Sequence, residues 1–278
     1  MEKILFVTDA IELNNKTLDF AAYLCSLTHS KLTGIFLENT EYETRSADTL
    51  RKEAVLAGNA VKGTSVRELK DTCCEHCIEQ FKRACEVRGI TGIVHRDRGN
   101  PSRDILMESR YADMMLVEVE TSFENKGGSM PSRFVRDVLA EAECPVIIMP
   151  GSFEGIERIV FTYDGLPSSV FAMKQFIHLF PQLSEYPVSV VAIKGEKAID
   201  PEERYKLKEW LHNHYKNINF VEEEGNIRLG LLEQLLRTKN AFIVMGAYGR
   251  SRLSNLFSPS HATGVLKIIS QPVFITHT

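Results

Sequence analysis

"KILFVTDA" at residues 3–10 returns as "RIVFTYDG" at residues 158–165, and this repeat decides how the chain is divided. Each stretch is an apolar run that ends in an aspartate, Asp9 in the first and Asp164 in the second. An apolar run of this length, bounded by a turn residue, is typical of a buried strand. The two copies therefore predict two related halves, each opening with a buried strand.

Later parts of the two halves repeat as well. The pairs are "RGNPSRDIL" (98–106) with "EGNIRLGLL" (224–232), "ADMMLVEVE" (112–120) with "NAFIVMGAYG" (240–249), and "CPVIIMP" (144–150) with "QPVFITH" (271–277). The first-strand aspartates lie 155 residues apart, but Pro145 and Pro272 lie only 127 apart, so the first half carries extra residues. We assign them to an insertion at 38–65. The predicted domains are 1–150 and 151–278, joined near the Gly-containing stretch at 149–157.

Short apolar, β-branched runs alternate with segments whose apolar residues are spaced by three and four. The predicted strands are 3–8, 32–37, 91–95, 113–119 and 145–149, then 158–163, 187–193, 218–222, 241–246 and 272–276. The predicted helices are 15–29, 66–88, 101–110 and 132–142, then 168–179, 201–216, 227–238 and 260–270. Apolar strands separated by helices indicate a parallel sheet covered on both faces. We therefore predict an α/β fold of two tandem doubly wound, five-stranded parallel-sheet domains, Rossmann-like in each half.

Composition narrows the class of protein. The chain has 278 residues, 44% of them hydrophobic, and a formal net charge of −4. A mildly acidic chain argues against nucleic acid or an anionic membrane as partner, because both require a basic face. No apolar run approaches the length of a membrane span, and the N-terminal stretch turns acidic too early for a signal peptide. These features predict a cytoplasmic protein.

Four of the six cysteines gather between Cys73 and Cys85, together with His76. A metal or redox role is one interpretation, because Cys73 and Cys77 are one helical turn apart. The spacing matches no familiar zinc pattern, and a tetrahedral site usually joins two separate segments. We favour a partly buried, Cys-rich helix face in a reducing compartment, with no metal site and no disulfide framework.

Function is expected where the strands end, because parallel sheets bind ligands beyond their carboxyl ends. "MGAYGRSRLSNLFSPSHATGV" at 245–265 follows such a strand. The chain resembles the universal stress protein family in its tandem form. The resemblance rests on these residues, on the order of strands and helices, and on the aspartates that follow the first strand of each half. The family's fold is adenine nucleotide alpha-hydrolase-like, and its nucleotide-binding members carry G-x2-G-x9-G-[ST] after the fourth strand. Gly246, Gly249 and Ser260 match this pattern, whereas Pro259 replaces the third glycine.

The resemblance implies a site for ATP or another adenine nucleotide in the second half. No metal ion is expected except Mg²⁺ bound together with the nucleotide. Small residues let backbone N–H groups approach phosphate oxygens, and a serine at a helix start adds a donor beside the helix dipole. Pro259 removes one N–H but still suits the first turn of a helix. The assigned nucleotide-binding residues are Thr162, Asp164, Gly246, Gly249, Arg250, Ser258 and Ser260.

The two glycines and the aspartate of this site also have a structural interpretation. Gly246 and Gly249 would serve a tight strand exit that needs positive φ, and Asp164 would cap a turn or helix. In the first half, Val117 to Glu120 stand where the second half has Gly246 to Gly249. Two carboxylates there would repel a phosphate, so we expect the first half to have lost nucleotide binding and to be structural or regulatory.

Two hypotheses of different class follow. The protein is either a stress-response sensor or regulator controlled by a nucleotide in its second half, or a scaffold of the same fold that acts through an unknown protein partner. The chain carries no full Walker loop, nucleophile elbow or metal-binding His pair, so an enzyme is not the favoured hypothesis, and the resemblance implies at most slow ATP hydrolysis. The resemblance also implies that the two Pro-Val strands meet in an intramolecular pseudo-dimer, with a homodimer left open.

Overall fold

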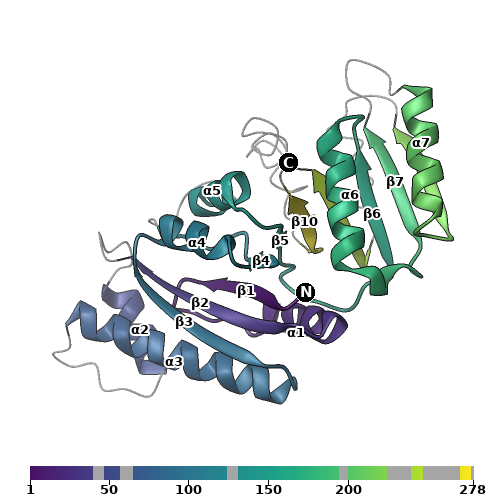
Figure 1. Cartoon of the computed structure of the whole chain (residues 1–278). Helices are drawn as coiled ribbons and strands as arrows, with labels where there is room; N and C mark the ends of the chain where they lie inside the picture. Colours follow the sequence, from purple (N-terminus) through teal and green to yellow (C-terminus); the bar gives the residue numbers. More distant parts are fainter. Residues whose placement is uncertain are drawn as a thin grey trace. The chain divides into compact units, whose positions relative to one another are not determined.

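The structure is a computed structural model that describes residues 1–39, 47–56, 65–123, 131–193, 200–223, 239–246 and 270–276. Two compact units make up the chain, Met1–Cys144 and Pro145–Thr278. Each alternates strands and helices, so the predicted α/β class is confirmed (Figure 1). Within the described residues, no helix combines the length and apolarity needed to cross a bilayer.

In the first unit four parallel strands are ordered β3-β2-β1-β4. The strands are β1 (Lys3–Thr8), β2 (Lys31–Asn39), β3 (Gly92–Gly99) and β4 (Met114–Val117). The helices are α1 (Thr17–Thr28), α2 (Ala47–Leu56), α3 (Val66–Val87), α4 (Pro101–Ser109) and α5 (Arg133–Glu141). The strand order reverses direction after β3, so α1 and α3 cover one face of the sheet and α4 and α5 the other (Figure 1).

Aromatic packing holds α3 on this sheet. The Phe81 ring of α3 lies 6.0 Å from the Phe6 ring of β1 and 5.7 Å from the Phe36 ring of β2. Gly34 makes room for them, because a Cβ at that position would lie 2.9 Å from both Phe36 and Phe81. All three rings are fully buried, so this cluster forms the centre of the first unit's core.

The second unit is ordered β5-β10-β9-β6-β7-β8. The strands are β5 (Val146–Ile148), β6 (Arg158–Tyr163), β7 (Val188–Ile193), β8 (Ile218–Glu223), β9 (Ala241–Gly246) and β10 (Val273–Thr276). All neighbours pair in parallel except β5 and β10, which are antiparallel, with Ile148 opposite Val273. The two Pro-Val strands therefore meet, as expected, whereas the pseudo-dimer and the domain limits 1–150 and 151–278 stay predictions.

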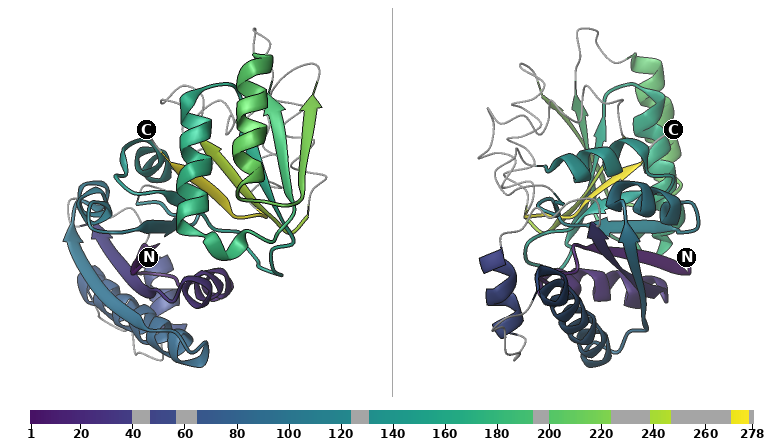
Figure 2. Two further views of the ribbon diagram at one scale, coloured as in Figure 1. Left: turned by 45° about the vertical axis from the view of Figure 1, so that its right-hand side comes forward. Right: turned by 90° about the vertical axis from the view of Figure 1, so that its left-hand side faces the viewer.

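Helices α6 (Pro167–Leu179) and α7 (Pro201–His212) lie side by side on one face of this sheet (Figure 2). A short 3-10 turn, η1 (Pro181–Leu183), follows α6. The Phe176 ring of α6 lies 4.9 Å from Phe242 of β9 and 5.4 Å from Phe274 of β10. These edge-on contacts fix α6 over the middle of the sheet.

All ten predicted strands are present, and their ends agree within a few residues. The insertion at 38–65 was predicted only as extra residues, with no secondary structure assigned. The structure shows that it contains helix α2. The expected helix at 201–216 is shorter than predicted, ending at His212. The expected helices at 227–238 and 260–270 lie outside the described residues.

Candidate functional site

The aspartates that close β1 and β6 form the same turn in both units. Asp9 Oδ1 accepts a hydrogen bond from Ile11 N, and Asp164 Oδ1 accepts one from Leu166 N, each at 3.1 Å. The residue between them has positive φ in each case, 60° at Ala10 and 79° at Gly165. The repeat seen in the sequence is thus a repeated Asx turn at the carboxyl end of the first strand.

In the second unit this turn leads directly into α6. The helix begins at Pro167, and its N-cap residue, Leu166, has no side chain that can cap it. The carboxyl group of Asp164 lies near the hydroxyl groups of Ser168 and Ser169 in the first turn, and the Ser169 hydroxyl donates to Leu166 O at 2.8 Å. Burial raises the pKa of Asp164, and the hydrogen bond from Leu166 N, with the two hydroxyl groups nearby, opposes that rise. An acidic group is thus held at the positive end of the α6 dipole.

Gly246 ends β9 beside the same two serines. A Cβ at Gly246 would lie 2.6 Å from the carbonyl carbon and oxygen of Ser168 and 2.7 Å from the backbone nitrogen of Ser169. The φ of Gly246 is not positive, so the strand-exit interpretation, which required positive φ, is wrong in its physical reason. Glycine is needed here because the backbone of α6 approaches too closely for any side chain.

The structure therefore brings three of the predicted site residues to one edge of the sheet. Thr162 Oγ1 donates to Val244 O at 3.2 Å, which ties β6 to β9 just before Asp164 and Gly246. Ser168 and Ser169 were missed from the sequence, although "GLPSS" at 165–169, with serines just after a helix-starting proline, was the available signal. The remaining predicted residues, Gly249, Arg250, Ser258 and Ser260, lie outside the described residues.

Strand register corrects the assignment in the first unit. Phe6 pairs with Leu116, and its repeat partner Phe161 pairs with Val244. Counting on by two residues places Glu118, and not Val117, at the position of Gly246. Apolar sequences alone do not fix this one-residue shift, because only pairing between strands sets the register.

The Glu118 carboxyl group is turned into the unit at this position. Its Oε1 accepts a hydrogen bond at 2.9 Å from Thr17 Oγ1, at the first residue of α1. Burial raises the pKa of Glu118, hydrogen bonds from Thr17 and Asn14 oppose that rise, and the charges of Glu120 and Glu12 add to it. Thr17 Oγ1 also lies 2.8 Å from Asn14 O, so one hydroxyl proton faces two acceptors. A glutamine amide at this position would donate to Thr17 Oγ1 and leave the hydroxyl proton for Asn14 O.

Glu118→Gln should therefore stabilise the protein near neutral pH by about 1 kcal/mol, the size of one net hydrogen bond. The pKa of Glu118 is raised in the folded state, so ionisation of this group costs stability as pH rises through the folded pKa. The gain in the variant should be largest above that pKa and should vanish below the unfolded pKa of about 4.3. Urea denaturation midpoints of both proteins across this pH range measure the difference.

Glu75→Gln is the matched control, because Glu75 is exposed on α3 and is not among the charges that shift the pKa of Glu118. It should leave the midpoints within about 0.5 kcal/mol of the parent at every pH. A Glu118→Gln variant that is less stable than the parent near neutral pH would show that the ionised carboxylate stabilises the first unit.

Helix α2 covers the Asp9 turn of the first unit. Ile11 is 8% exposed and packs in one buried cluster with Leu50 and Ala54 of α2 and with Leu69 and Cys73 of α3. Leu166 holds the equivalent place in the second unit and is 41% exposed. Helix α2 thus covers the carboxyl edge of the sheet at Ile11 in the first unit, whereas the same edge is exposed to solvent at Leu166 in the second unit.

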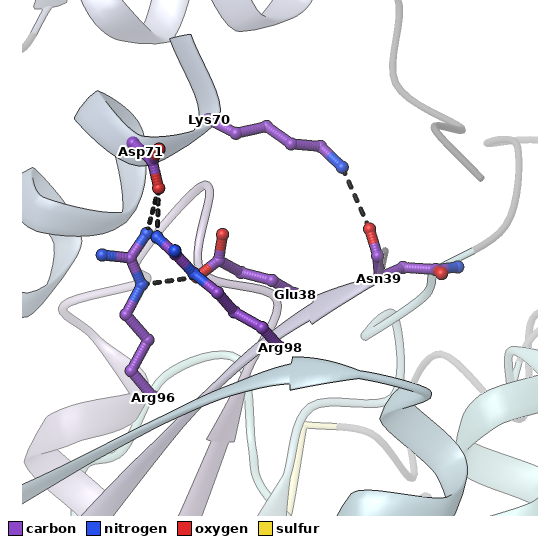
Figure 3. Close-up of polar contacts among 6 residues, drawn as sticks. All are labelled: Glu38, Asn39, Lys70, Asp71, Arg96 and Arg98. Carbon is purple, nitrogen blue, oxygen red and sulfur yellow. Dashed lines mark hydrogen bonds and ion pairs between the residues drawn. The ribbon is translucent and has the colours of Figure 1, made fainter. Parts of the chain in front are cut away.

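A cluster of ion pairs lies at the carboxyl ends of β2 and β3 (Figure 3). Glu38 Oε1 accepts from Arg96 Nε at 2.5 Å and from Arg98 Nε at 3.1 Å. Asp71 Oδ1, on α3, accepts from the same two guanidinium groups, at 2.6 Å in the case of Arg96. Lys70 Nζ donates to Asn39 O at 3.2 Å. Two acids neutralise two arginines here, so the cluster ties α3 to the sheet edge.

All six cysteines are buried, and none forms a disulfide. Burial raises the pKa of Cys25, Cys74, Cys77 and Cys144 to about 12 and that of Cys85 to about 11. Among the described residues, which include every cysteine, no group of three or more His, Cys, Asp or Glu side chains is arranged to hold a metal ion. The four cysteines of α3 are all buried, so the Cys-rich helix face is more fully buried than the partly buried face that was expected.

Native thiols should accordingly react slowly with Ellman's reagent. A pKa of 12 in place of 9 lowers the thiolate fraction about a thousandfold at a slightly alkaline pH. We expect all 6 cysteines to react at once in concentrated guanidinium chloride and none on the same timescale in the folded protein. Rapid reaction of one native thiol would establish a reactive cysteine and revive the redox hypothesis.

Solved structures provide the comparison for this fold. A universal stress protein from Archaeoglobus fulgidus DSM 4304 matches with a TM-score of 0.61 at 14% identity, covering 99% of this chain and 98% of that one. The chain has the fold of a universal stress protein. A functionally unknown protein from Pseudomonas aeruginosa PAO1 matches with a TM-score of 0.60 at 12% identity, covering 100% of this chain and 92% of that one. No family model and no curated protein sequence matches.

The universal-stress-protein fold agrees with the resemblance stated from the sequence. Both structural matches extend over nearly the full length of their chains, so the agreement includes both halves. Thr162, Asp164 and Gly246 lie at the carboxyl edge of the second unit's sheet, where folds of this class bind ligands.

Proposed function

We propose that this protein is a tandem universal stress protein that binds an adenine nucleotide in its second half and acts as a sensor or regulator in a stress response. The observation that carries the proposal is the meeting of Asp164 and Gly246 at the first turn of α6. The backbone N–H groups of a helix start, with serine hydroxyls beside them, suit a phosphate or a ribose hydroxyl. The glycine-containing loop begins at this point of the fold.

The contrast between the units supports binding in the second half only. Glu118 places a buried carboxyl group against the start of α1 in the first unit, at the register position of Gly246. When ionised, that carboxyl group would repel a phosphate. In the second unit this position carries no side chain, and the backbone at the start of α6 lies beside it instead.

A scaffold function is the second candidate, and two observations favour it. The contact with Ser168 and Ser169 requires glycine at 246 whether or not a ligand binds. Asp164 forms the same turn as Asp9, although helix α2 covers the Asp9 turn in the first unit. Formation of the turn is therefore a sufficient reason for an aspartate at this position, without a ligand. In this alternative the second half binds a protein partner and no nucleotide.

The two candidates differ in their response to Gly249→Val. Calorimetric titration with ATP should give binding to the parent and a loss of at least about tenfold in affinity in the variant, because a side chain would keep phosphate from the loop backbone. Gly246→Val is unsuitable as the test, because it would displace α6 through the contact with Ser168. Gly151→Val, at a glycine with nothing within 4 Å of its Cβ position, is the control. Equal ATP affinity in Gly249→Val and the parent would contradict the assignment.

A further inference from the structure

A cavity of about 590 Å³ opens between α6 and α7 in the second unit, next to the Asp164 turn. Its walls are mainly apolar and aromatic, with Tyr163 from β6, Phe171 from α6 and Trp210 from α7. Leu166 forms part of the rim, and Lys174 and Glu203 bring the charged groups. Small-molecule sites typically have ~300–1,000 Å³ and this mixture of apolar walls with a few polar groups.

The first unit has no exposed apolar residue at the position equivalent to Leu166. There the residue equivalent to Leu166, Ile11, is covered by Leu50 and Ala54 from helix α2. The second unit has no counterpart of that insertion, because the spacing of the repeats is shorter by its length. Leu166 is consequently 41% exposed beside an apolar cavity. A ligand with an apolar group would bind favourably there, because it would remove this apolar surface from water.

The charges around the cavity are divided between its two helices. Lys206 of α7 also lines the cavity, but Glu202 pairs with it at 2.6 Å. Lys174 on α6 and Glu203 on α7 have no ion-pair partner within the described part of the chain. One cation and one anion are therefore left to face a ligand from opposite helices.

Negative charge is concentrated near Tyr163. Burial raises the pKa of the Tyr163 hydroxyl, and the carboxylates of Glu203, Asp164 and Asp200 raise it further. A positively charged group on a ligand would be attracted to this side of the cavity, and a carboxylate to the Lys174 side. The cavity is thus polarised as well as aromatic.

We propose that this cavity binds a free aromatic amino acid, with its ring against Phe171 and Trp210, its carboxylate toward Lys174 and its ammonium group toward Glu203. Aromatic walls favour an aromatic ring through edge and face contacts. The paired opposite charges select a zwitterion over a ligand of one sign. The cavity adjoins the Asp164 turn, but Thr162, Asp164 and Gly246 do not line it, so it is proposed as a second small-molecule site beside the nucleotide site.

Trp210 reports on the cavity directly, because it is the only tryptophan of the chain. L-Phenylalanine is the probe, compared with phenethylamine, which lacks the carboxylate, and with 3-phenylpropionate, which lacks the amine. At constant pH, L-phenylalanine should change Trp210 fluorescence saturably at millimolar concentration. Each analogue should bind about fivefold more weakly, the upper end for losing one exposed ion pair.

Two charge variants separate the ends of the ligand. Lys174→Gln should weaken L-phenylalanine and 3-phenylpropionate about fivefold and leave phenethylamine unchanged. Glu203→Gln should weaken L-phenylalanine and phenethylamine and leave 3-phenylpropionate unchanged. Lys208→Gln and Glu209→Gln are the matched controls, because both residues are exposed on α7 and neither lines the cavity. All four substitutions are at exposed side chains, so the variants should fold.

The same titrations distinguish this site from the nucleotide site. Gly249→Val and excess ATP should both leave L-phenylalanine binding unchanged, whether or not the protein binds nucleotide. Competition by ATP would overturn the proposal of a separate site. Equal binding of 3-phenylpropionate and L-phenylalanine, or no binding of any of the three probes, would overturn the amino acid assignment.

Discussion

Gly246→Ala should destabilise the second unit by about 3 kcal/mol, the upper end for adding one methyl group to a packed interior. The new Cβ would lie 2.6 Å from backbone atoms of Ser168, and backbone atoms cannot turn away as a flexible side chain can. Relief requires α6 to move, and that movement would open the contacts of Phe176 with Phe242 and Phe274. The loss should appear as a lower urea denaturation midpoint for the second unit.

Gly151→Ala is the control for this substitution. Gly151 belongs to the same unit, is exposed, and has nothing within 4 Å of its Cβ position. The control should stay within about 0.5 kcal/mol of the parent. If Gly246→Ala is as mild as Gly151→Ala, α6 does not approach the end of β9 as described, and the structural reason for this glycine fails.

Glu38→Gln should destabilise the first unit by about 2 kcal/mol, below the ~3–5 kcal/mol for breaking a fully buried pair. The Glu38 side chain is 9% exposed and accepts from both Arg96 and Arg98. The arginine side chains are 23% and 44% exposed, so water compensates part of the loss. Thermal or urea unfolding measures the change, and added salt should reduce it only slightly because the carboxylate is shielded from solvent.

Glu143→Gln provides the comparison. Glu143 pairs with Arg110 at 2.6 Å, but both side chains are more than half exposed. Exposed pairs contribute at most about 1 kcal/mol, so this variant should change stability little. Equal effects of Glu38→Gln and Glu143→Gln would show that the cluster at the ends of β2 and β3 contributes no more than a surface ion pair.

Strands such as β1, β4 and β9 could be predicted from the sequence because they are apolar and buried along nearly their whole length, whereas the edge strand β3 is charged and partly exposed over its second half. Helix α2 was missed because only Leu50 and Ala54 are buried on it, which leaves little apolar periodicity to detect. The ion-pair cluster had a visible signal in "HRDRG" at 95–99, where Arg96 and Arg98 alternate with other charges. Residues two apart on a strand share a face, but their partners Glu38 and Asp71 come from distant segments.

Only part of the candidate site could be predicted from the sequence. Asp164 and Gly246 could be selected because each follows an apolar run, and both lie at the expected edge. The reason for Gly246 could not be deduced, because the approach of the α6 backbone depends on how helix and sheet pack. The position of Glu118 likewise depended on strand register, which a single sequence leaves undetermined by one residue.

The stoichiometry of ATP binding tests the central proposal most directly. Purified full-length protein is freed of any copurified nucleotide and titrated with ATP in a calorimeter. We expect one ATP per chain, bound in the second half, because Glu118 fills the equivalent position in the first. Two ATP per chain would contradict the role given to Glu118, and no binding would contradict the nucleotide proposal and leave the scaffold function.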